Sequence, residues 1–93
     1  METRHVLLTH KVGLHARPSV KLTKLAKSFE ARIELSLSSE GPWIDAKSIV
    51  KVMAVKAPKG VTLYFRADGG DAEATLKAML ALVASDFGEA GNQ

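Results

Sequence analysis

Two stretches of the chain carry apolar residues at helical spacing. The first set is Leu22, Leu25, Ala26 and Phe29, and the second is Leu76, Met79, Leu80 and Val83. Each set stands at i, i+3, i+4 and i+7, which predicts an amphipathic helix. Pro18 is tolerated in a first helical turn, because the N–H groups there have no intrahelical partner. We therefore expect one helix from about Ala16 to Ser28. The last helix should end at Gly88, with Asp71 placed to cap its start.

Apolar and polar residues alternate in other segments, which indicates half-buried strands. These are residues 4–9, 32–38 and 61–67, and residues 43–45 form a short returning strand after a turn. In the second segment the expected buried side chains are Ile33, Leu35 and Leu37, opposite Glu34, Ser36 and Ser38. We expect Trp43 to cap the sheet edge. The order strand, helix, strand, strand, helix, strand, helix implies a sheet with helices on one face.

A short helix is predicted after Ser48, because serine is a favoured N-cap. Its apolar residues are Ile49, Val50, Val52 and Met53. They fall on more than one side, whereas a helix of two turns needs only one buried stripe. The surplus indicates an exposed apolar patch of the kind used for partner binding. The alternative is that all four residues belong to the core.

The segment from Gly13 to Pro18 holds the candidate chemistry, because it places His15 at or just before a helix start. Unpaired N–H groups and the helix dipole favour anions at that position. Arg17 adds donors that match phosphate oxygens. These positive groups disfavour the imidazolium and favour the neutral, nucleophilic ring. The site is suited to carrying phosphate on His15. The alternative is a solvated histidine beside an ordinary surface arginine.

Length and composition narrow the function further. The 93 residues suffice for one small domain, and the absence of cysteine excludes disulfides and fits a reducing cytosol. We expect no signal peptide and no membrane span. His10 and His15 alone make a weak metal pair, so we expect no metal, and we expect His5 and His10 to face solvent. The net charge of +3 indicates an acidic partner or a nucleic acid. Binding to a nucleic acid is disfavoured, because the chain has few aromatic residues for stacking on bases and no recognised nucleic-acid-binding motif.

The segment G-L-H-A-R-P-S, residues 13–19, resembles the active-site loop of the HPr family. These proteins are histidine-containing phosphocarriers of the bacterial phosphoenolpyruvate-dependent phosphotransferase system. A second segment, A-K-S-I-V-K-V-M at residues 46–53, resembles the short second helix of that family. It places Ser48 at the family's regulatory serine. Length and element order also match over residues 4–87. The loop at 39–42 is about two residues longer than the family pattern.

The resemblance implies an α+β fold, an open-faced two-layer sandwich with a four-stranded antiparallel sheet and three helices (βαββαβα). The whole chain, 1–93, would be one phosphocarrier domain, with 88–93 a polar tail. It would be a stoichiometric carrier without a cofactor, not an enzyme. Enzyme I would phosphorylate His15, and an enzyme II A component would receive the group. Arg17 and the backbone N–H groups of Ala16 and Arg17 would hold the phosphoryl oxygens.

The resemblance also implies a partner interface and a regulatory site. The interface residues would be Ala16, Lys24, Lys27, Ile49, Val50 and Met53, with Val52 packed inward. For the two lysines the alternative is a solvated helix face. Ser48 would be phosphorylated by a serine kinase and restored by a phosphatase, although capping alone also explains it. The protein would be a cytoplasmic monomer. The alternative function is a regulatory module, nitrogen-linked or kinase-controlled, whose phosphorylation selects partners rather than driving sugar uptake.

Overall fold

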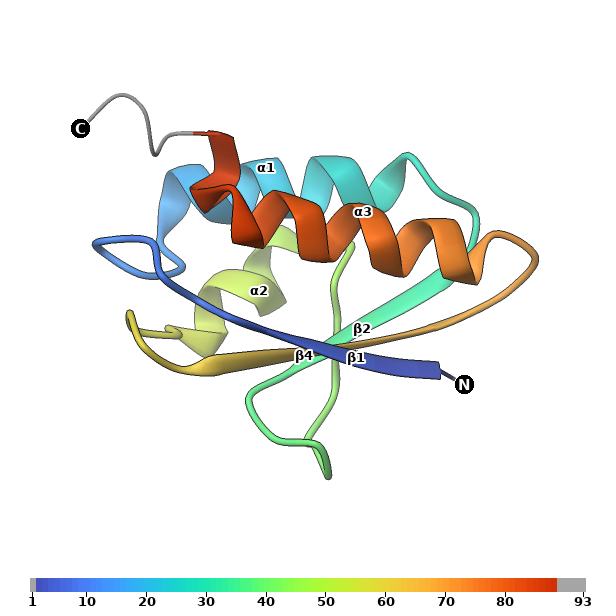
Figure 1. Ribbon diagram of the computed structural model, residues 1–93, viewed down its shortest axis with the longest axis horizontal. Coiled ribbons are helices and arrows are strands. Elements are labelled where there is room, and N and C mark those ends of the chain that lie inside the picture. Colours follow the sequence, from blue (N-terminus) through green and yellow to red (C-terminus); the bar gives the residue numbers. More distant parts are fainter. Residues whose placement is uncertain (1, 89–93) are drawn as a thin grey trace.

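The structure is a computed structural model that describes residues 2–88. Its strands are β1 (Glu2–Leu7), β2 (Arg32–Ser36), β3 (Ile44–Asp45) and β4 (Thr62–Asp68). Its helices are α1 (Ala16–Lys27), α2 (Ile49–Val55) and α3 (Ala72–Ala84), followed by the 3-10 turn η1 (Asp86–Gly88). The strands pair antiparallel in the order β1-β4-β2-β3. The helices lie over one face of this sheet (Figure 1), so the predicted βαββαβα sandwich is confirmed.

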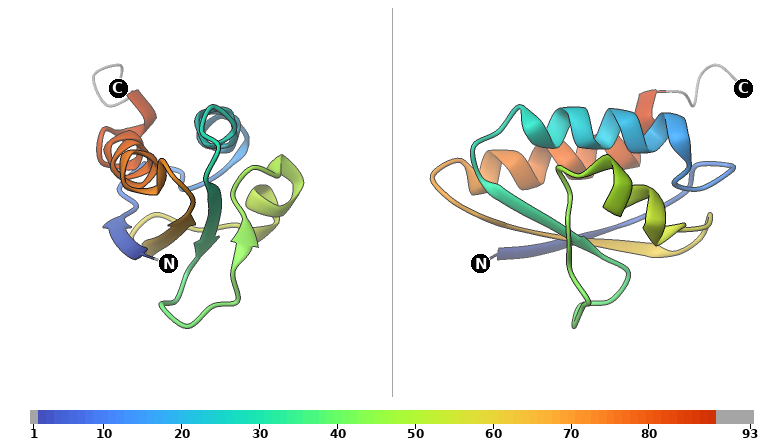
Figure 2. Two further views of the ribbon diagram at one scale, coloured as in Figure 1. Left: turned by 90° about the vertical axis from the view of Figure 1, so that its right-hand side faces the viewer. Right: turned by 180° about the vertical axis from the view of Figure 1, so that it is seen from behind.

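The core lies between the sheet and the helices. Strand β4, at the centre of the sheet, buries Leu63, Phe65 and Ala67 on one face, as its alternation predicts. The helical stripes meet this face through buried residues of α1 and α3, namely Leu22, Ala26, Leu76, Met79 and Val83. Seen along the helices, α1 and α3 lie side by side above the strands, and α2 lies beside α1 (Figure 2). Burial of these side chains is the main force that holds the two layers together.

The pattern of β2 is broken at its end. The strand stops at Ser36 rather than Ser38, and Leu37 is 42% exposed whereas Ser36 is buried. The prediction that Leu37 points inward is therefore wrong. The Ser36 hydroxyl accepts a hydrogen bond from the Ser38 N–H at 3.0 Å, which satisfies it locally and turns the chain away from the sheet. Alternation holds only while the backbone stays extended.

Helix α3 is bounded differently from the prediction. Asp71 occupies the N-cap position, but its side chain makes no capping hydrogen bond. Its carboxylate instead accepts the N–H groups of Glu30 and Ala31, at 3.1 and 2.8 Å, and so ties the start of α3 to the segment before β2. The helix ends at Ala84, four residues before Gly88, and the turn η1 follows.

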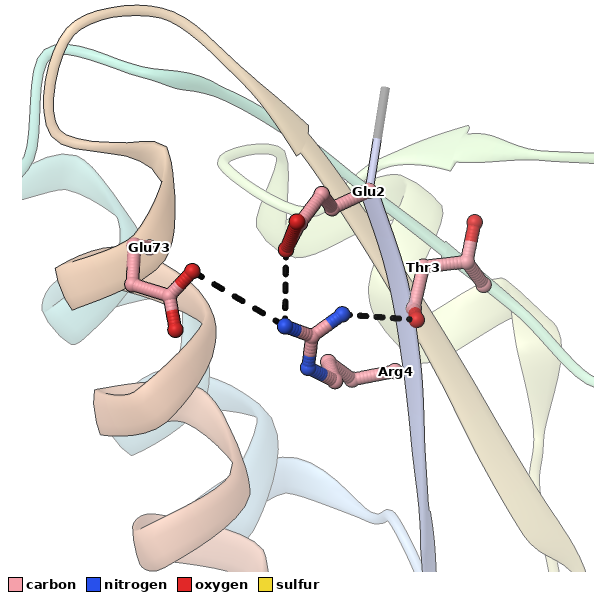
Figure 3. A network of polar contacts seen from close by, with 4 residues as sticks. All are labelled: Glu2, Thr3, Arg4 and Glu73. Atoms are coloured by element: carbon pink, nitrogen blue, oxygen red, sulfur yellow. Dashed lines mark hydrogen bonds and ion pairs between the residues drawn. The ribbon is translucent and has the colours of Figure 1, made fainter.

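Polar contacts join the exposed edge strand β1 to α3. Arg4 Nη2 lies 2.7 Å from Glu2 Oε1 and 3.8 Å from Glu73 Oε1, and Arg4 Nη1 donates to the Thr3 carbonyl at 3.2 Å (Figure 3). These side chains are exposed, so water and salt screen the ion pairs and their contribution to stability is small.

Strand β1 starts at Glu2 and ends at Leu7, two residues earlier at each end than the predicted 4–9.

The face of the sheet away from the helices carries a cluster of side chains around Arg66. Trp43 immediately precedes the edge strand β3, and its ring lies over the Arg66 guanidinium, 4.3 Å from the ring centroid. Arg66 Nε also contacts Glu34 Oε1 at 2.7 Å, from the neighbouring strand. Trp43 thus reaches from the sheet edge toward the central strand.

Within residues 2–88, no helix has both the length and the apolarity that crossing a membrane requires.

Candidate functional site

The loop between β1 and α1 is held in place by Gly13. This residue has φ +77°, and a Cβ atom on it would lie 2.5 Å from the Ala57 carbonyl oxygen. That same oxygen accepts the Leu14 N–H at 2.8 Å. The close approach joins this loop to the loop after α2. Only glycine combines the left-handed backbone with the missing side chain that this contact requires.

His15 is the N-cap residue of α1, as predicted. Its backbone is extended (φ −107°, ψ −158°), its side chain is exposed and makes no capping hydrogen bond, and its carbonyl accepts the Ser19 N–H at 2.9 Å. The amides of Ala16 and Arg17 donate to no group within residues 2–88. An exposed imidazole therefore stands at a helix start beside two unpaired N–H donors, which is a favourable place for an anion.

Arg17 follows in the first turn, and its side chain is exposed. No carboxylate of the described residues forms an ion pair with it. Pro18 is buried in the same turn, in agreement with its predicted place at the helix start. The guanidinium is therefore available to an external anion, and its planar set of donors matches phosphate oxygens.

An exposed apolar surface adjoins His15. A shallow depression of about 420 Å³ is lined by Val12, Leu14, His15, Ala16, Met53, Lys56, Ala57 and Pro58. Helix α2 contributes to it and packs against α1, and its Val52 is fully buried. Val50 is 75% and Met53 40% exposed, and Ile49 is half-buried. The four apolar residues of α2 are thus not all core, and the predicted inward direction of Val52 is confirmed.

Ser48 caps α2, as predicted, because its Oγ accepts the Lys51 N–H at 3.3 Å. It lies at the end of α2 away from His15. Lys47 Nζ donates to the Phe29 carbonyl at 2.7 Å, just beyond the end of α1, whereas Met53 lines the depression beside His15. The two helices thus run in opposite directions (Figure 2). The seven residues of α2 span about 10 Å along the helix axis.

The exposed side chains of Lys24 and Lys27 lie in the last turn of α1, where cations interact favourably with the helix dipole. They therefore stand at the same end of the helix pair as Ser48, and not beside His15. The structure brings His15, Ala16, Arg17 and Met53 together, and it places the two lysines and Ser48 at the other end of the α1–α2 pair.

His10 differs from its prediction. It is only 7% exposed, and its ring lies between those of Phe87 and His15, with centroid distances of 5.8 and 5.6 Å. His5, in contrast, is exposed as expected. The cause is a contact with Phe87, 77 residues further along the chain, which no local pattern indicates. Within residues 2–88, no three His, Cys, Asp or Glu side chains are grouped so as to hold a metal ion.

Comparison with known proteins identifies the class. A family model described as the HPr component phosphorylation site of the phosphotransferase system matches residues 2–85. The chain is 43% identical over 89 residues to the phosphocarrier protein HPr of Cupriavidus necator, covering 96% of this chain and 98% of that one. It is 36% identical over 84 residues to the phosphocarrier protein NPr of Escherichia coli, covering 90% and 92%.

Solved structures agree with the sequence matches. A crystal structure of HPr from Thermoanaerobacter tengcongensis superposes with a TM-score of 0.87 at 31% identity, covering 96% of this chain and 98% of that one. The fold and the matches together define a phosphocarrier of the phosphotransferase system. The chain belongs to the HPr family.

Proposed function

We propose that His15 accepts a phosphoryl group from enzyme I and passes it to an enzyme II A component. The observation that carries this proposal is the exposed imidazole at the start of α1, beside the unpaired N–H groups of Ala16 and Arg17. The description of the matching family model, a phosphorylation site, supports it. The protein would act stoichiometrically, because each molecule carries one group and returns to its starting state after donation.

The chemistry requires little beyond position and charge. A lone pair on a ring nitrogen of His15 attacks phosphorus, and the bond from phosphorus to enzyme I breaks as the new nitrogen–phosphorus bond forms. The transferring group is stabilised mainly by correctly placed positive charges. The amides of Ala16 and Arg17 and the Arg17 guanidinium supply these charges. The same groups then stabilise the phosphohistidine until an acceptor takes the phosphoryl group.

The test is phosphorylation in a defined mixture of phosphoenolpyruvate, enzyme I and this protein. We expect one acid-labile phosphate per molecule by intact mass measurement, and none on His15→Ala, whose thermal unfolding should be unchanged. His5→Ala is the matched control, because His5 is exposed on the sheet, and it should accept phosphate like the wild type. An acid-labile phosphate on His15→Ala would refute the assignment.

Arg17→Ala tests the role of the guanidinium. We expect transfer to slow by about 10-fold or more, since one charged hydrogen bond contributes roughly 1.5–3 kcal/mol, while His15 is still fully modified at long times. Arg32→Ala is the control, because Arg32 is an exposed arginine of β2. A wild-type transfer rate for Arg17→Ala would remove this arginine from the mechanism.

We further propose that enzyme I and the II A component dock on the face shared by α1 and α2. The residues of this docking face are Ala16, Lys24, Lys27, Ile49, Val50 and Met53. The exposure of Val50, and of Met53 beside His15, supports an apolar centre, and the two lysines favour an acidic partner. Transfer rates should therefore fall with increasing salt, and salt-independent rates would contradict the role of the lysines.

Ser48 is proposed as the site of a serine kinase and phosphatase. A phosphate there would carry about −1.5 to −2 charges on the docking face, about 10 Å from the His15 end of α2, and would repel an acidic partner. Ser48→Asp should therefore slow transfer from enzyme I, whereas Ser48→Ala should retain the wild-type rate. Equal rates for the two variants would contradict regulation through charge.

Relatives named HPr and NPr match the chain at 43% and 36% identity, so a second role is proposed as the alternative. In it the protein is a nitrogen-linked or kinase-controlled regulatory module whose phosphorylation selects partners. Phosphate transfer to II A components for sugars would support transport, and transfer restricted to a regulatory II A component would support the alternative.

In both roles we propose that the chain acts as one phosphocarrier domain, a monomer in the cytoplasm. Size-exclusion chromatography coupled to light scattering tests the monomer.

A further inference from the structure

Three aromatic rings form a row that ends at His15. The Phe87 ring contacts the His10 ring edge-on at a centroid distance of 5.8 Å and an interplanar angle of 75°. The His10 ring lies 5.6 Å from the His15 ring at 51°. Phe87 and His10 are buried, whereas His15 is exposed. The row therefore runs from the interior to the candidate phosphorylation site, and we call it the ring row.

The inner end of the ring row is held by contacts with two other parts of the chain, α1 and the segment after β1. Phe87 has a left-handed backbone (φ +59°), and its carbonyl accepts a hydrogen bond from Lys21 Nζ of α1 at 2.8 Å. The preceding residue, Asp86, accepts the Thr9 hydroxyl at 2.5 Å, from the segment that leads into the active loop. A left-handed backbone at a non-glycine residue persists only when its surroundings hold it there. These contacts are such surroundings.

The middle ring is oriented by the loop itself. The Val12 N–H donates to His10 Nδ1 at 3.4 Å, and the His10 carbonyl accepts the Gly13 N–H at 3.0 Å. The contact restrains rotation of the His10 ring, so the loop orients this ring as well as burying it. His15 has no comparable support, because its side chain makes no capping hydrogen bond.

We propose that His10 is a positioning residue that holds the His15 imidazole in the orientation required for phosphoryl transfer. The inference rests on the proposed role of His15 as the phosphoryl acceptor. An exposed side chain can occupy three staggered χ1 positions and two ring orientations. Contact with a buried, oriented ring on one side favours one of them. Transfer depends on the reacting nitrogen already pointing at the phosphorus, so this restriction raises the rate.

The expected size of the effect follows from the number of orientations lost. If His15 sampled all three χ1 positions, about one third of the molecules would be competent, and with both ring orientations about one sixth. The apparent affinity falls with the competent fraction. Loss of the His10 ring should therefore lower kcat/KM for transfer from enzyme I by about 3- to 6-fold.

Two substitutions separate the ring from the hydrogen bond. His10→Phe keeps a ring between Phe87 and His15 but removes the acceptor for the Val12 N–H. His10→Asn keeps an acceptor and removes the ring. We expect His10→Phe to retain the wild-type kcat/KM within about 2-fold, and His10→Asn to show the full loss. The matched control is His5→Asn, because the His5 ring lies 5.7 Å from Tyr64 on the sheet, and its rate should be unchanged.

The second readout is the side chain of His15, measured by NMR without any partner. Three-bond couplings that report χ1 should indicate one rotamer in the wild type and in His10→Phe, and averaging in His10→Asn. The proposal is overturned if the two variants transfer at equal rates, if His10→Phe is the slower one, or if the couplings of His10→Asn match the wild type. Should the wild type accept no phosphate, the proposed function fails, while the couplings still decide whether His10 orients His15.

Discussion

Gly13→Ala is the substitution for which the structure predicts a large effect from a single methyl group. The alanine Cβ would lie 2.5 Å from the Ala57 carbonyl oxygen and 3.0 Å from Pro58 Cα, both backbone atoms. Backbone atoms cannot move aside as a flexible side-chain end can. The loop before α1 and the loop after α2 must therefore separate, and the Leu14 N–H, which donates to that oxygen at 2.8 Å, loses its partner.

Two terms contribute to the loss of stability. An alanine at φ +77° costs about 1–2 kcal/mol, because its Cβ approaches the following carbonyl oxygen. The Leu14 N–H belongs to a buried residue, and leaving a buried donor unpaired costs about 1–3 kcal/mol. We expect the free energy of unfolding to fall by about 2–5 kcal/mol. The melting temperature should then fall by about 10 °C or more in a domain of this size.

Urea unfolding followed by circular dichroism measures this loss, and Gly60→Ala is the matched control. Gly60 also has a positive φ, +97°, but a Cβ there would meet no atom within 4 Å. Its substitution should cost only the backbone term of about 1–2 kcal/mol. Equal losses for the two variants would refute the reasoning, because the close approach to Ala57 would then contribute nothing.

Three further substitutions test other parts of the structure. Asp71→Ala removes the acceptor for the N–H groups of Glu30 and Ala31 and should lower the free energy of unfolding by about 1–3 kcal/mol; an unchanged urea midpoint would contradict this role. Phe65→Ala opens a cavity in the central strand and should cost about 3–5 kcal/mol, and a loss below about 1 kcal/mol would place the ring outside the core. Val50→Ser should change stability by less than about 0.5 kcal/mol, yet slow transfer from enzyme I; a wild-type rate would remove Val50 from the docking face.

The element order and most of the core follow from local patterns. Each predicted helix and strand is present, because the spacing of apolar residues depends only on backbone geometry and on which face is buried. The position of His15 at a helix start could also be predicted, since Pro18 fixes that boundary by the chemistry of its own ring. The start of α3 also lies where the sequence predicts it, but the Asp71 side chain does not cap the helix, because it accepts the N–H groups of Glu30 and Ala31 before β2.

The surroundings of His15 could be predicted only in part. His10 looks like an exposed loop residue in the sequence, and its burial depends on Phe87, whose left-handed backbone follows no periodic signal. Leu37 shows the opposite error, because alternation continues in the sequence after the strand has ended at Ser36. Both errors arise from contacts or chain reversals that only the assembled fold creates. The nearness of Met53 to His15 likewise depends on the assembled fold and follows from no local pattern.

The position of β4 has a consequence for how the molecule assembles. The last strand in the sequence is a central one, and both β1 and β2 form their long ladders with it. Until the ribosome has released residues 62–68, the strand at the amino end has no neighbour, and half of the sheet cannot exist. Sequence-distant pairings of this kind slow folding. The nascent chain must therefore wait in a partly formed state, and a fragment that stops before Thr62 should lack both long ladders of the sheet.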